Sequence, residues 1–231
     1  MPEFKAQPLK HNDIRTGMSL VQTVYAVAMT YGLKNVVETS YLIFFSPNPA
    51  RSSPLHLYVI TFAFAAVMLL AVRFFWVPRN LYDYVLKRFP QIGDKVFARL
   101  TLFQIPIALG HAVLFFFVCH AFDEMANPRV QLGHASVGDL ALRFVGMYAA
   151  LLLLNALWLY GITSDSDDGP ARKIWARSNL ICALSALLLL GVFHVRHFSA
   201  DVFISAACGF FVANGLFDLL KAAKHYIVFE N

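Results

Sequence analysis

The chain has 231 residues, of which 58% are hydrophobic and only 14% are charged, and its mean hydropathy is +0.59. So few charged side chains cannot cover the surface of a water-soluble domain of this length, and the composition therefore excludes an ordinary soluble protein. The formal net charge of +5 indicates no nucleic-acid partner, because attraction of basic loops to anionic lipid head groups accounts for it.

Apolar stretches long enough to cross a lipid bilayer recur along the chain. A helix needs about 20 residues to span about 30 Å of hydrocarbon. The predicted spans are 18–44, 56–77, 98–122, 138–161, 177–195 and 200–222. Their apolar character is continuous, whereas the strands of a membrane β-barrel alternate. The sequence thus predicts an all-α polytopic membrane protein, with a polar N-terminal segment at 1–17, a six-helix transmembrane domain at 18–222 and a short C-terminal tail at 223–231.

The connections between these spans are rich in polar and turn-forming residues. They lie at 46–54, 78–94, 126–134 and 164–170. Ser136, followed three residues later by Asp139, resembles a capping box that opens the fourth helix.

Lysine and arginine are distributed unevenly between the two sides of this topology. Thirteen lie on the side of the two termini, three on the opposite side, and Lys34, Arg73 and Arg143 fall within or at the edges of spans. Because positively charged loops tend to remain cytoplasmic, we predict a multi-pass protein of the cell membrane with both termini in the cytoplasm.

The first span carries a polar stripe along an otherwise apolar helix. Ser19, Thr23, Thr30, Lys34 and Glu38 recur at steps of seven or four residues, which places them on one helical face. A charge near the middle of a bilayer costs at least about 2.5 kcal/mol on insertion scales, so these side chains should face protein or water. The stripe therefore predicts either the lining of a transport path or an ion pair between Lys34 and Glu38 that is buried between helices.

Two short stretches resemble a known channel family. The sequence VYAVAMTYGL at 24–33 is similar to the first helix of the filter-less potassium channels of prokaryotes and endolysosomes, and FFWVPRNLYDY at 74–84 is similar to the end of that family's second helix. The family's Arg-x-x-x-Phe-Ser-Asp motif is not kept. The resemblance implies six spans and an oligomeric channel whose pore is lined by the first helices.

That resemblance also implies which residues line the pore. The corresponding positions are Val27, Thr30 and Lys34. A ring of Val27 side chains suits a hydrophobic constriction that controls permeation by dewetting, and Thr30 suits a hydration or coordination site. A ring of Lys34 side chains would favour anions unless Glu38 neutralises it.

In the third helix and beyond, histidines and amides offer other interpretations. His111, near the middle of the third span, is expected to be either a haem ligand or a core histidine that forms a hydrogen bond between helices. Asn155 and Asn214 are expected to form hydrogen bonds between helices. The three cysteines, Cys119, Cys182 and Cys208, lie within spans and are expected to be packing residues, with no disulfide framework.

Most of the remaining histidines map to the side opposite the termini. His194, His197 and Asp201, with His120 from another helix, are candidate ligands of a divalent metal. A haem between facing helices needs two imidazoles at matching depth, and His120 with His194 or His197 could supply them. The alternatives are interfacial histidines that bond to water and head groups, or pH sensing.

The function predicted from these patterns is an integral membrane channel or transport protein, with Thr23, Val27, Thr30, Lys34 and Glu38 as its site residues. Its partners would be the lipid bilayer, further copies of the same chain and a small ion. No resident cofactor and no catalytic motif is predicted. The alternatives are a non-transporting subunit that binds haem or metal through histidines, and an accessory or scaffold subunit of a membrane complex.

Overall fold

The computed structural model describes residues 11–45, 55–88, 105–127, 136–162, 169–196 and 198–226. These residues form six α-helices and no strand. The helices are α1 (His11–Phe45), α2 (Leu57–Arg88), α4 (Ile105–Ala126), α5 (Val137–Ile162), α6 (Gly169–Arg196) and α7 (Ala200–Tyr226). The prediction of an all-helical protein is therefore confirmed.

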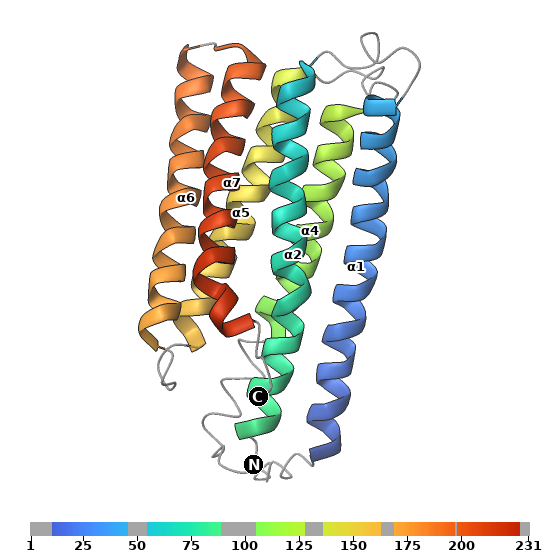
Figure 1. Cartoon of the computed structure of the whole chain (residues 1–231), viewed down its shortest axis with the longest axis vertical. Helices are drawn as coiled ribbons and strands as arrows, with labels where there is room; N and C mark the ends of the chain where they lie inside the picture. The colour runs from blue at the N-terminus through green and yellow to red at the C-terminus, as the bar shows by residue number, and fades with distance from the viewer. Residues whose placement is uncertain are drawn as a thin grey trace, which may run out of the picture.

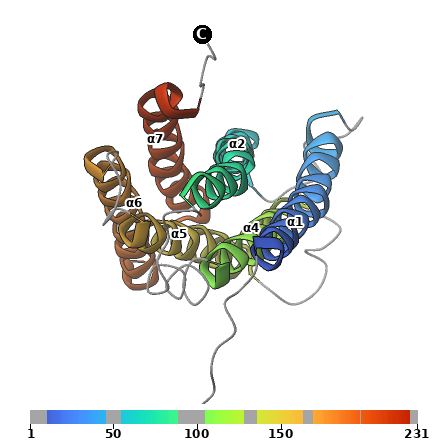
Figure 2. The same cartoon turned by 90° about the horizontal axis from the view of Figure 1, so that it is seen from below.

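The six helices run up and down through one elongated bundle (Figure 1). We call the end at which α1 begins the lower end and the end at which α1 finishes the upper end. In the view along the bundle, α6, α5, α4 and α1 form a curved row, and α7 and α2 lie on one side of that row (Figure 2). α2 packs mainly against α7, its distant neighbour in sequence, so the fold closes by joining an early helix to the last one.

Five of the helices are long and apolar enough to cross a membrane. Their qualifying segments are Leu57–Phe75, Ile105–Ala126, Val137–Tyr160, Lys173–Arg196 and Ala200–Leu220. At 35 residues α1 is also long enough, but polar residues dilute its apolar content, and its crossing of the bilayer stays a prediction. Large apolar side chains such as Leu188 and Leu220 are exposed on the outside of the bundle, as expected of a surface that faces lipid.

Several helices extend beyond the apolar spans predicted for them. α2 continues through Pro78 as far as Arg88, although 78–94 was expected to be a connection. A proline removes one backbone hydrogen bond from a helix without necessarily ending it, and the Leu, Lys and Arg residues that follow are good helix formers. α5 begins as predicted: the backbone N–H of Asp139 donates to Ser136 Oγ over 3.1 Å, and the Ser136 N–H donates to Asp139 Oδ2 over 3.3 Å.

The core holds the bundle together with small residues and stacked rings. The three cysteines are all buried, as expected of packing residues. A side chain added at Gly215 of α7 would come within 2.9 Å of Leu69 Cβ on α2, so this glycine allows the two helices to approach closely. Tyr148 of α5 stacks on Phe211 of α7 and donates its hydroxyl proton to the Ala66 carbonyl of α2 over 3.0 Å, which ties three helices together.

Candidate functional site

The predicted polar stripe lies on the face of α1 that points away from the bundle. Thr23, Val27, Thr30, Lys34 and Glu38 are all exposed. The opposite face of α1 is buried against its neighbours through residues at steps of three or four, which are Val21, Tyr25, Ala28, Gly32, Val36, Thr39 and Ile43. The structure thus places the five predicted residues together on one outward-facing surface of the protomer.

Lys34 and Glu38 form an ion pair on this surface. Lys34 Nζ lies 3.7 Å from Glu38 Oε1, and each side chain is 62% exposed. The pair is therefore not enclosed between helices of one protomer. Gly32 lies against Cys119, seven residues before the end of α4 at Ala126, so Gly32 is roughly 10 Å below the upper end of α4, and Lys34 and Glu38 follow two and six residues farther up α1.

The threonine hydroxyls of the stripe are already used by the helix. Thr23 Oγ1 donates to the Ser19 carbonyl over 2.9 Å, and Thr30 Oγ1 donates to the Ala26 carbonyl over 2.8 Å. The hydroxyl protons are thus satisfied by carbonyls of the same helix, and the oxygen lone pairs can accept a hydrogen bond or contact a cation. Threonine at these positions is consequently compatible with water, protein or lipid.

A second site, which no sequence motif indicated, lies inside the bundle. Arg73 of α2 and Asp218 of α7 form a buried ion pair, with 2.6 Å between Nη1 and Oδ2 and with both side chains at most one-tenth exposed. Arg73 Nη2 also donates to Asn179 Oδ1 of α6 over 2.9 Å. A buried charge is tolerated when it is paired and hydrogen-bonded, and here α7 supplies the counter-ion of Arg73 and α6 a hydrogen-bond acceptor, while Asp218 Oδ1 has no hydrogen-bond partner among the described residues.

A chain of hydrogen bonds leads from this ion pair toward the outside. Asn214 Nδ2 donates to Asn179 Oδ1 over 3.0 Å, and Ser178 Oγ donates to Asn214 Oδ1 over 2.6 Å. The predicted role of Asn214 in bonding between helices is confirmed. The signal for the ion pair was present in the sequence as a single arginine near the end of one apolar run and a single aspartate near the end of another.

His111 of α4 is buried, 1% exposed, next to this network. Its ring packs edge-on against Phe74 and Trp158, and neither ring nitrogen has a hydrogen-bond partner among the described residues. The core position was expected, but the expected hydrogen bond between helices is not found there. Because aromatic rings, and no second imidazole, surround His111, the described residues do not form a haem site around it.

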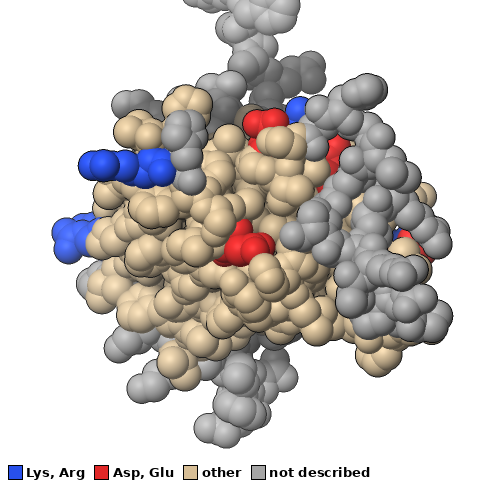
Figure 3. Space-filling model, turned by 90° about the horizontal axis from the view of Figure 1, so that it is seen from above, with Lys and Arg blue, Asp and Glu red and all other residues tan. Residues whose placement is uncertain are grey.

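The upper end of the bundle collects carboxylates and imidazoles in pairs rather than in one cluster. In the view from above, acidic side chains appear at separate places on a mostly uncharged surface (Figure 3). His56 contacts Asp201, while Thr39 donates to Asp123. The contact between His56 and Asp201 joins the start of α2 to the start of α7.

This arrangement does not assemble the predicted metal ligands. His120 lies 3.5 Å from Glu124 on its own helix, Asp201 is engaged by His56, and His194 is exposed. No group of three metal-ligating side chains occurs in the part of the chain that the structure describes. The remaining candidate, His197, lies outside the described residues.

Comparison with known proteins adds no relative. No family model, curated protein or solved structure matches the chain.

Proposed function

We propose that this chain is the subunit of a homo-oligomeric membrane channel or transporter, in which the exposed face of α1 meets further copies of α1 and lines the path of a small ion. The observation that carries the proposal is the Lys34–Glu38 pair, which is exposed on the outside of a bundle made for lipid. A charged group is costly to place in hydrocarbon, whereas water or another subunit can solvate or pair with it.

The composition of the α1 face supports a path rather than a sealed contact. Val27, 51% exposed, lies two turns below Lys34, and Thr30 lies between them. A ring of valines would form a narrow apolar constriction, with threonine oxygens and opposite charges above it. Because Glu38 lies within 3.7 Å of the ammonium group, the ring of Lys34 side chains would be partly neutralised, which weakens selection for anions.

The depth of the pair favours a second candidate function. Both residues lie above Gly32, which is itself only roughly 10 Å below the upper end of α4, so the long side chains of Lys34 and Glu38 can reach toward the head groups without an oligomer. This chain would then be an accessory subunit that docks on a different membrane protein through its α1 face. The two functions differ in whether α1 meets α1.

Cysteine cross-linking separates these functions, because all three native thiols are buried. The variant Thr30→Cys places one accessible thiol on the α1 face, and Leu188→Cys places a matched thiol on the exposed side of α6, where Leu188 is 70% exposed. We expect mild oxidation in liposomes to link Thr30→Cys into disulfide-bonded dimers and to leave Leu188→Cys monomeric. A charged thiol reagent should then reduce ion flux through Thr30→Cys and leave Leu188→Cys unaffected.

Absence of cross-linking at Thr30→Cys and at Val27→Cys, in protein that elutes as a folded species, would rule out the α1-lined path. Cross-linking without ion flux in any tested salt would support an oligomer that does not transport, and so would also contradict the proposal.

A further inference from the structure

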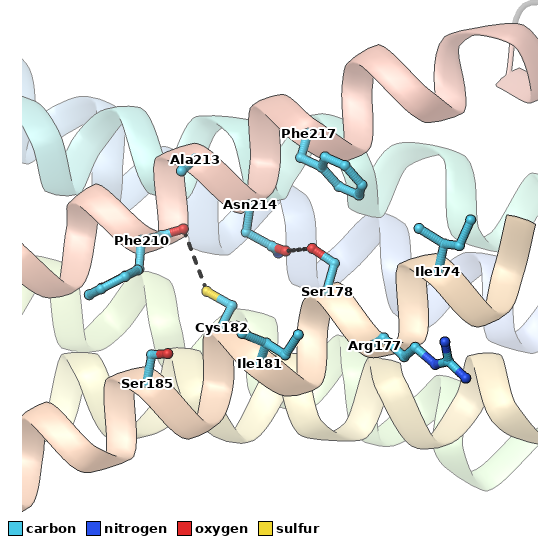
Figure 4. Close-up of a pocket in the computed structure, with 10 residues that line it drawn as sticks. All are labelled: Ile174, Arg177, Ser178, Ile181, Cys182, Ser185, Phe210, Ala213, Asn214 and Phe217. Carbon is cyan, nitrogen blue, oxygen red and sulfur yellow. Dashed lines mark hydrogen bonds between the residues drawn. The ribbon is translucent and has the colours of Figure 1, made fainter.

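A groove between α6 and α7 opens onto the outer surface of the bundle (Figure 4). Its volume is about 530 Å³, and its lining includes Arg177, Ser178, Ile181, Cys182, Phe210 and Asn214. Ile181 and Phe210 are exposed, so the groove faces the lipid that surrounds the helices. It lies on the far side of the molecule from the α1 face and is independent of the transport proposal.

The lining changes in polarity along α6. At the lower end Arg177 borders the groove, and Lys173 stands one helical turn before it on the same face. Next comes the hydrogen-bonded pair of Ser178 and Asn214. Farther up, the lining is mainly apolar, with Ile181, Cys182 and Phe210, and Ser185 is the last polar residue. Ile174 and Phe217 add apolar surface at the lower end, while the polar groups of the lining, a cation followed by an amide and a hydroxyl, follow the order of the groups that a phospholipid presents from its phosphate inward.

Neither of the two cations at the lower end has a carboxylate partner among the described residues. Lys173 and Arg177 are exposed and form no ion pair with any side chain that the structure describes, whereas Arg143 lies 3.7 Å from Glu124. Basic residues between membrane helices near a head-group region bind anionic lipid head groups. Asn214, which lines the groove, donates one of the two protons of Nδ2 to Asn179 Oδ1, and an amide nitrogen carries a second proton.

We propose that this groove is a binding site for one anionic phospholipid. Arg177 and Lys173 hold the phosphate, Asn214 donates to an ester carbonyl, and an acyl chain lies along Ile181 and Phe210. Because Asn214 is bonded to Asn179, which accepts from Arg73, the occupied groove is continuous with the buried ion pair. A ligand that binds only the folded state raises its stability, so binding can be measured without any assay of transport.

The test uses the full chain, purified in detergent, with phosphatidylglycerol added and phosphatidylcholine of the same acyl chains as the comparison. We expect phosphatidylglycerol to remain bound at one molecule per chain in mass spectra of the intact complex and to raise the midpoint of thermal unfolding. Phosphatidylcholine should do neither. The double variant Lys173→Gln and Arg177→Gln should bind phosphatidylglycerol about thirtyfold more weakly, since it removes two cations near the head group.

Two further variants separate the groove from general charge effects. Arg196→Gln removes an exposed cation from the upper end of the same helix and should leave binding unchanged. Ala213→Phe fills the groove from an exposed position, keeps both cations and should abolish retention of the lipid. Equal retention of both lipids, or full affinity in the double variant or in Ala213→Phe, would overturn the proposal. So would equal stabilisation by inorganic phosphate alone, because the site would then recognise a free anion.

Discussion

Two ion pairs of similar chemistry occupy opposite environments in this molecule. Lys34 and Glu38 lie one turn apart on a single helix, with both side chains 62% exposed. Arg73 and Asp218 come from two helices and are buried, and Arg73 also donates to Asn179 of a third helix. The first pair forms whenever α1 is helical, while the second exists only when α2, α6 and α7 are assembled.

The difference shows what each pair can do. A buried pair reports on the fold, because removing one member leaves the other charged and unpaired in a medium of low polarity. An exposed pair contributes little to the stability of the protomer that carries it. Its position on the outward face of α1 is the basis for proposing a role outside the protomer, whereas the buried pair acts within it.

The largest effect is expected from breaking the buried pair. Arg73→Met should lower the free energy of unfolding by about 3–5 kcal/mol, because Asp218 then remains in the core without its cation. The measurement is chemical unfolding in detergent, followed by circular dichroism. The double variant Arg73→Met and Asp218→Leu should recover most of the loss, since Asn179 still accepts from Asn214. A double variant as unstable as the single one would show that the ion pair itself, and not an orphaned charge, sets the stability.

A smaller effect is expected from pushing α2 and α7 apart without touching either charge. Gly215→Ala would place a carbon 2.9 Å from Leu69 Cβ, and the shift needed to relieve this contact should cost about 1–3 kcal/mol of unfolding free energy. Gly209→Ala is the matched control on α7, because an added carbon there meets nothing within 4 Å. If both variants were equally stable, the close approach of α2 and α7 would not support the buried pair.

The smallest effect on stability is expected at the exposed pair. Lys34→Leu should change the free energy of unfolding by less than about 1 kcal/mol, yet alter the ratio of anion to cation flux in liposomes. Arg143→Leu is the control, since it removes a similarly exposed ion-pair partner elsewhere on the bundle. Unchanged selectivity in Lys34→Leu would make the pair a head-group contact, whereas a loss of several kcal/mol would erase the contrast between the two pairs.

The helices could be predicted from the sequence because hydrocarbon thickness alone sets the length of an apolar run. The ends of the helices were harder to predict. α2 continues through Pro78, because its polar second part extends the helix of its apolar first part without a break. The pairing of α2 with α7 could not be predicted either, because every apolar run offers a similar surface to every other. The neighbour is selected by side-chain fit, as at Gly215, and by polar partners, as at Arg73 and Asp218.

The polar stripe on α1 and the network around Arg73 also differ in how far the sequence predicts them. The stripe on α1 follows from helical periodicity within one segment, so its five residues could be placed on a common face from the sequence alone. The network around Arg73 depends on three segments, and Arg73 alone carries no information about which acid it meets. The histidines on the upper side were expected to gather, but His56 and His120 each pair with a nearby carboxylate, because pairing of single imidazoles needs no shared cavity.

The network around Arg73 also has a consequence for how the chain is made. Arg73 is synthesised 106 residues before Asn179, the nearer in sequence of its two partners. At a synthesis rate of about 5–20 residues per second, Asn179 is made roughly 5–20 s after Arg73, and Asp218 is made later still. During that interval Arg73 lacks the groups that neutralise it, so we expect α2 to settle to its final depth only after α7 has been synthesised.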